Sequence, residues 1–118
     1  MTDLTPDLQF LVGEPLNAVH FVMDYVELHF NGSYLRCLMP PAVTVADKTT
    51  AFPLPGSRDA LCARIGAAVH EIGGQVGREL RVAFSDGAIL TASLVNTAHR
   101  DQEVLHFHDH LTGKTQWW

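Results

Sequence analysis

The residues most capable of chemistry lie near the end of the sequence, in the run His106-Phe107-His108-Asp109-His110. Side chains alternate between the two faces of a β-strand, so a strand here would place His106, His108 and His110 on one face. Imidazole nitrogens are common ligands of divalent transition metals, and three of them match the ligand number of an open zinc site. The run therefore offers ligands for a site that could hold Zn²⁺ or another divalent metal, although the favoured expectation is that the chain has no cofactor.

Strand geometry limits this prediction, because the first and third histidines of the run would lie about 13 Å apart along a straight strand. Two of them together with His99, His20 or His29 would make a more compact ligand set. The favoured interpretation is a half-buried strand whose apolar residues, Leu105 and Phe107, face the core while the histidines face water. The sequence has no Cys-x-x-Cys or HExxH motif, which weakens the metal interpretation.

Other catalytic arrangements have little support in the sequence. It contains no G-x-S-x-G motif for a nucleophilic serine. The glycines Gly73 and Gly74 are not followed by the Lys-Ser/Thr pair of a phosphate-binding loop. The acidic residues are spread along the chain, and no carboxylate pair stands out. We therefore assign no catalytic residue and favour a protein that is not an enzyme.

The composition is that of a folded domain with a real core. The chain has 118 residues, of which 47% are apolar and 18% are charged, and we expect residues 1–118 to form a single domain. Its formal net charge is −5, and its eight lysines and arginines are scattered. A nucleic-acid-binding protein usually clusters basic residues, so this class is disfavoured. The acidic balance would suit a basic protein partner.

The first 15 residues lack the basic segment of a signal peptide. No apolar run approaches the ~20 residues that a membrane-spanning helix needs. We therefore expect a cytoplasmic protein that does not enter a membrane. In that reducing compartment the two cysteines, Cys37 and Cys62, are predicted to be buried free thiols.

The elements that would position these residues follow one plan twice, in residues 5–39 and 58–94. Each half predicts a short helix that ends at a glycine, then a strand and a β-hairpin. Residues 40–56 connect the halves, and Ala42–Val45 could form an edge strand there. A last strand is predicted at residues 104–110. The expected fold is α+β and internally duplicated, αβββ-αβββ-β. Its sheet would be mostly antiparallel or a partly open barrel, with both short helices on one face.

The first hairpin is the clearest local prediction. Asn31-Gly32 is a preferred pair for a two-residue type I′ turn. The register that follows pairs Leu28 with Leu35 on an apolar face and Glu27 with Arg36 on the other face. We expect the charged pair to be a solvated surface feature of small energy.

The second hairpin surrounds the loop Ser85-Asp86-Gly87. A three-residue loop with glycine in the left-handed conformation pairs Val82 with Leu90. The adjacent pair on the same face is Leu80 with Ala92. The second hairpin, like the first, therefore places its larger apolar residues on one face.

Aromatic residues suggest a partner-binding patch. Trp117 and Trp118 end the sequence, and we expect at least one of them to pack while the other anchors a partner. Phe52, in the long connector, would extend the same surface. The predicted patch covers the connector, the final strand and the C-terminus, and its residues are Phe52, His106, His108, His110, Trp117 and Trp118.

The stretch LVGEPLNAVHFVMDYVELHFNGSYLRC, followed by GSRDALCARIG and LRVAFSDGAILTASL, resembles a family of small uncharacterised bacterial proteins. Members carry two strand-turn-strand units around a short helix and often end near a tryptophan. Some are encoded beside secreted toxins and are similar to immunity proteins. The resemblance implies that the chain sequesters a toxin by direct binding, and it transfers no functional residue.

The leading hypothesis is a non-enzymatic protein-binding module of the immunity type that blocks a basic partner, such as a toxin. The first alternative is a metal-binding protein or small metalloenzyme that uses His106, His108 and His110. The second is a structural subunit that forms a homodimer through the exposed edges of its sheet.

Overall fold

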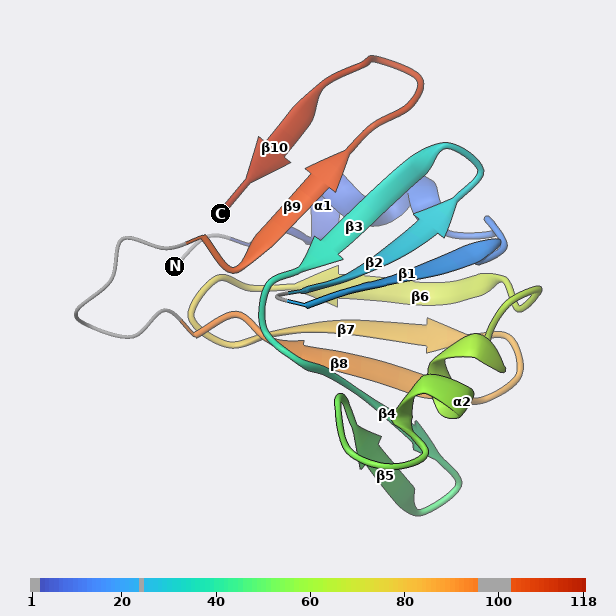
Figure 1. Ribbon diagram of the computed structural model, residues 1–118. Coiled ribbons are helices and arrows are strands. Elements are labelled where there is room, and N and C mark those ends of the chain that lie inside the picture. Colours follow the sequence, from blue (N-terminus) through green and yellow to red (C-terminus); the bar gives the residue numbers. More distant parts are fainter. Residues whose placement is uncertain (1–2, 24, 96–102) are drawn as a thin grey trace.

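The computed structural model describes residues 3–23, 25–95 and 103–118, which fold mainly into β-strands (Figure 1). His99, named above as a candidate metal ligand, lies outside these residues. The strands form two five-stranded antiparallel sheets. In spatial order, the first sheet contains β1 (Ala18–Val22), β2 (Tyr25–Phe30), β3 (Ser33–Cys37), β9 (Leu105–His108) and β10 (Thr115–Trp117). The second contains β5 (Lys48–Ala51), β4 (Pro41–Val45), β8 (Ile89–Ser93), β7 (Glu79–Phe84) and β6 (Val69–Gly74).

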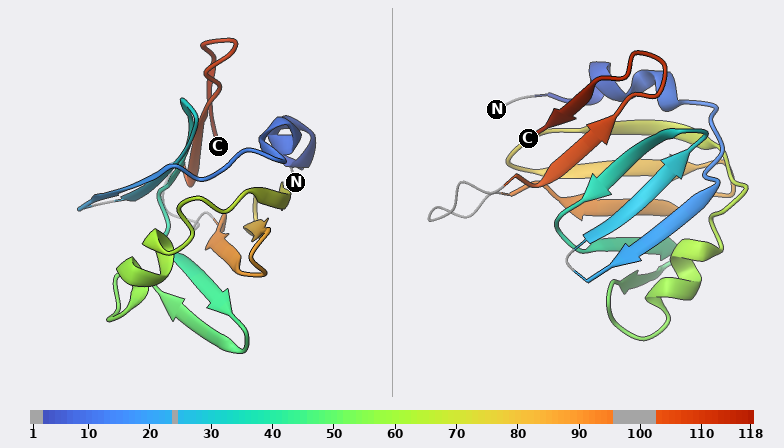
Figure 2. Two further views of the ribbon diagram at one scale, coloured as in Figure 1. Left: turned by 90° about the vertical axis from the view of Figure 1, so that its right-hand side faces the viewer. Right: turned by 45° about the horizontal axis from the view of Figure 1, so that its top comes forward.

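The helices are short and lie on different sides of the molecule (Figure 2). The first, α1 (Thr5–Leu8), continues into a 3₁₀ turn, η1 (Gln9–Leu11), and both pack against β6. The second, α2 (Ser57–Cys62), contacts β1, β4 and β5. Helices of this length depend on tertiary packing, and each has a buried leucine, Leu8 in α1 and Leu61 in α2.

The core contains the inward-facing side chains of both sheets. Leu28, Leu35 and Phe107 are buried on the first sheet, and Val82 and Leu90 are buried on the second. The sheets are joined by backbone hydrogen bonds between residues 13–16 and 66–69. The opposite side of the first sheet does not face this core, and polar side chains occupy it.

The predicted internally duplicated αβββ-αβββ-β fold is wrong. The chain is mostly β, and the strands β1–β3 and β6–β8 lie in two sheets instead of one. Residues 40–56, predicted as a connector, supply β4 and β5, and the two helices do not cover a common face. Apolar spacing reports which side chains share a strand face, but it does not report which sheet a strand joins.

Both predicted hairpin registers are confirmed. Leu28 pairs with Leu35, and Asn31 and Gly32 both have positive φ, as a type I′ turn requires. In the second hairpin Val82 pairs with Leu90. Local turn chemistry was sufficient for these predictions because the partners are near in sequence.

Three smaller expectations have mixed outcomes. The strand at Ala42–Val45 exists within β4, but β4 lies between β8 and β5, so it is not an edge strand. Both cysteines are free; Cys37 is buried as expected, whereas Cys62 is exposed. Across the described ranges, no helix has the length and apolar character needed to span a membrane.

Candidate functional site

The outward side of the first sheet carries two cross-strand rows of side chains, which we call the polar face. The strand register places the first row in the order Trp117, His106, Arg36, Glu27 and His20. It places the second row in the order Thr115, His108, Tyr34, His29 and Ala18. Alternation along each strand separates both rows from the core-facing residues.

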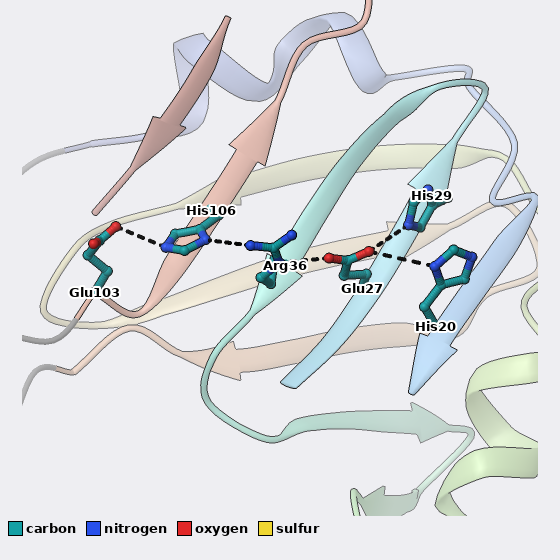
Figure 3. A network of polar contacts seen from close by, with 6 residues as sticks. All are labelled: His20, Glu27, His29, Arg36, Glu103 and His106. Carbon is teal, nitrogen blue, oxygen red and sulfur yellow. Dashed lines mark hydrogen bonds and ion pairs between the residues drawn. The ribbon is translucent and has the colours of Figure 1, made fainter. Parts of the chain in front are cut away.

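Glu27 is the centre of the polar face and is nearly enclosed, because its side chain is only 11% exposed. The Nε of Arg36 donates a hydrogen bond to its Oε2 at 2.7 Å. The Nε2 of His29 lies 2.9 Å from its Oε1, and the Nδ1 of His20 lies 3.6 Å from the same oxygen (Figure 3). The predicted Glu27–Arg36 pair therefore forms, but it is not the solvated ion pair expected from sequence.

The electrostatics of Glu27 follow from these contacts. Burial disfavours the charged carboxylate, but hydrogen bonds from His29 and Arg36 and the charge of Arg36 outweigh it, so the pKa of Glu27 is lowered. Burial lowers the pKa of Arg36, but the hydrogen bond and the charge of Glu27 outweigh this effect, so the pKa of Arg36 is raised. Glu27 is therefore an ionised acceptor at neutral pH.

The polar network continues from Arg36 to the next strand. The Nη1 of Arg36 lies 3.2 Å from the Nδ1 of His106, and the Nε2 of His106 lies 2.9 Å from an oxygen of Glu103 (Figure 3). A guanidinium can only donate, so the Nδ1 of His106 must accept. The proton of His106 is then on Nε2 and is donated to Glu103. One contact thus fixes both the tautomer and the orientation of this ring.

Stacked rings run across the same face. The ring centroids of His20 and His29 lie 4.0 Å apart, and His29 and Tyr34 are stacked at 5.3 Å. Tyr34 stacks in turn on His108 at 5.2 Å. The guanidinium of Arg36 lies 4.8 Å from the ring centroid of Tyr25. Such contacts hold the side chains in defined positions and cover the polar atoms between them.

The three histidines predicted as metal ligands have separate surroundings. His106 contacts Arg36 and Glu103, whereas the Nδ1 of His108 lies 2.9 Å from the Oγ1 of Thr115. The strand β9 ends at His108, so His110 lies beyond it. The ring of His110 lies against Gly32, on the turn between β2 and β3. The structure therefore does not bring the three imidazoles together.

The predicted aromatic patch is also divided. Trp118 packs against the core, as expected for one of the two tryptophans, while Trp117 is 59% exposed. Phe52 follows β5 and stacks on Phe21, with 5.7 Å between ring centroids. Figure 1 places β5 and β10 at opposite ends of the molecule. Trp117 therefore shares a surface with His106 and not with Phe52.

Another possible ligand set, missed by the sequence prediction, lies on the polar face. Among the residues described by the structure, one group of three potential metal ligands converges, namely His20, Glu27 and His29. Their ligand atoms lie within 4.8 Å of one another. The sequence feature that could have indicated this ligand set is the short connection between Val22 and Tyr25. When these two residues pair across the hairpin, the same register places His20 opposite Glu27.

No protein-family model, curated protein or solved structure matches this chain. The resemblance to a bacterial family with immunity-like members therefore stays a prediction.

Proposed function

We propose that this chain is a non-enzymatic protein-binding module and that the polar face is its binding surface. The observation that carries the proposal is the network centred on Glu27, which holds aromatic, imidazole and guanidinium groups in two rows across the sheet. The polar face replaces the binding patch predicted from sequence, because Phe52 follows β5 and does not lie on the polar face.

The residue types of the polar face suit protein recognition. Tyrosine, tryptophan and arginine are enriched at interfaces and dominate binding energy where they are buried on association. The face offers Tyr34 and Arg36 on β3 and Trp117 on β10, with β9 between these two strands. Stacking and hydrogen bonds already restrain Tyr34 and Arg36, so binding would order fewer free rotamers.

The charge of the chain favours a basic partner. The net charge of −5 would attract a basic protein over a distance and raise its association rate. On the polar face itself, Glu27 is engaged by Arg36, and the neighbouring Glu103 is engaged by His106. Close contact would therefore come from rings and N–H donors, with the overall charge acting as the steering field. An immunity protein that sequesters a basic toxin would have these properties.

The test compares two variants of equally exposed apolar residues. Trp117 on the polar face is 59% exposed, and Leu54 beside the second sheet is 60% exposed. A partner is captured from the source cells on immobilised wild-type protein, purified, and titrated against wild type, Trp117→Ala and Leu54→Ala. We expect Trp117→Ala to weaken the 1:1 complex about 30-fold, equivalent to ~2 kcal/mol, and Leu54→Ala to have less than about a twofold effect.

Two results would contradict the proposal. Equal affinity of wild type and Trp117→Ala for the partner would mean that the polar face is not the interface. A loss of affinity in Leu54→Ala alone would place the interface at the segment between β5 and α2. Light scattering on the free protein tests the homodimer alternative. A stable dimer that is disrupted by Trp117→Ala would mean that the face binds a second copy of the chain.

A further inference from the structure

Three potential ligands meet on the hairpin of β1 and β2. His20 and Glu27 are directly opposite each other on the two strands, and His29 follows Glu27 by two residues on the same face. The Nε2 of His29 and the Nδ1 of His20 both approach one oxygen of Glu27, at 2.9 and 3.6 Å. The antiparallel pairing of β1 and β2 fixes the backbone positions of all three residues.

These separations are close to those of a metal site. Ligand atoms about 2.0–2.2 Å from a tetrahedral zinc ion lie roughly 3.3 Å from one another. The ligand atoms here are within 4.8 Å, so modest side-chain rotations would bring them to that spacing. The hydrogen bond between His29 and Glu27 would be replaced by two bonds to the metal.

The surroundings of Glu27 support such a role. Arg36 holds Oε2, which leaves Oε1 directed toward the two imidazoles (Figure 3). In metal sites, a hydrogen-bond donor that holds the second oxygen of a ligating carboxylate fixes the orientation of that ligand, and Arg36 would do this for Glu27. His20 is on the solvent side, with a side chain 53% exposed, so an ion can enter and keep water in its remaining positions.

We propose that His20, Glu27 and His29 bind one divalent transition-metal ion. Two imidazole nitrogens and one carboxylate oxygen favour Zn²⁺ and its neighbours, such as Co²⁺ and Ni²⁺, over Mg²⁺ and Ca²⁺, which prefer oxygen ligands. The site has three protein ligands. Because the positive charge of Arg36 repels a cation, we expect the affinity of the site for the metal to be moderate. On binding, the proton of His29 moves from Nε2 to Nδ1, because the metal takes the Nε2 lone pair.

The experiment uses tag-free protein and Co²⁺, followed by Zn²⁺, as probes. Calorimetry gives the stoichiometry, and the visible absorption of Co²⁺ reports coordination by protein ligands. The test variant is His20→Ala, and the matched control is His108→Ala, which removes a histidine from the same face but not from the site. Both side chains are peripheral to the core, and circular dichroism checks that both variants fold.

We expect one ion per chain, an affinity loss of at least about tenfold in His20→Ala, and unchanged binding in His108→Ala. The Co²⁺ spectrum should disappear when Zn²⁺ displaces Co²⁺. No 1:1 binding would overturn the proposal. An equal loss in His20→Ala and His108→Ala would also overturn it, because that pattern indicates unspecific binding by surface histidines. These outcomes are independent of Trp117, so they leave the protein-binding proposal to its own test.

Discussion

Replacement of Glu27 by glutamine tests how strongly the polar face depends on its central charge. The variant Glu27→Gln keeps the shape of the side chain but removes its negative charge. Arg36, with a side chain only 27% exposed, then loses its ionic partner, and His29 loses a charged acceptor. We expect the folded state to be destabilised without any change in packing.

The magnitude follows from the contacts. A hydrogen bond to a charged group contributes about 1.5–3 kcal/mol, and breaking a fully buried ion pair costs about 3–5 kcal/mol. Arg36 can still reach water, and glutamine retains one acceptor oxygen, so the lower range applies. We expect a loss of ~2 kcal/mol in the free energy of unfolding at pH 7, or about 8 °C in Tm for a chain of this size.

The effect should depend on pH with a defined sign. The pKa of Glu27 is lowered in the folded state, so its contribution is fully present above the ordinary glutamate pKa. It is lost as the pH falls through the lower pKa of the folded protein. The difference between wild type and Glu27→Gln should therefore shrink progressively below about pH 4.

Urea denaturation at pH 7 and pH 3 measures both effects. The matched control is Glu103→Gln, the same substitution at a side chain that is 42% exposed and paired with His106. An exposed pair of this kind contributes less than about 1 kcal/mol. A loss of stability in Glu27→Gln that is no larger than in Glu103→Gln, or that is the same at both pH values, would contradict a strong ion pair at Glu27.

Three further predictions concern single positions. In the folded protein a thiol reagent should modify exposed Cys62 but not Cys37, because burial raises the pKa of the Cys37 thiol to about 12. Peptide mass spectrometry identifies the labelled cysteine, and rapid labelling of Cys37 would contradict its burial. Gly32→Ala should lower the free energy of unfolding by at least ~1 kcal/mol, because φ at this position is +101° and the new Cβ would lie 2.7 Å from the His110 ring. Urea denaturation measures this loss, and an unchanged midpoint would contradict the conformation of this turn. Trp118→Ala should lower stability by ~2 kcal/mol through lost core packing, and a wild-type Tm would show that this ring is not packed.

The parts of the fold that sequence could predict are those set by neighbours in the chain. The Asn31-Gly32 turn determined the pairing of Glu27 with Arg36, because a two-residue turn allows one register. The division into two sheets was not predictable in this way. It depends on β4 pairing with β8, and on β9 pairing with β3, across long stretches of sequence.

The same limit applies to the site. The alternation of His106 and His108 correctly indicated a shared strand face. Their partners could not be predicted, because Arg36 meets His106 only after β9 joins β3. The burial of Glu27 was missed for a related reason: stacked rings from neighbouring strands cover a carboxylate that a lone hairpin would leave in water.

Histidine footprinting of the complex tests most directly whether the polar face binds the partner. Diethyl pyrocarbonate modifies accessible imidazoles, and mass spectrometry compares each histidine in the free and the bound protein. His108 is on the polar face, whereas exposed His70 is on β6 of the second sheet. If the polar face is the interface, the partner protects His108 while His70 reacts as before. Protection of His70 with unchanged labelling of His108 would place the interface on the other sheet.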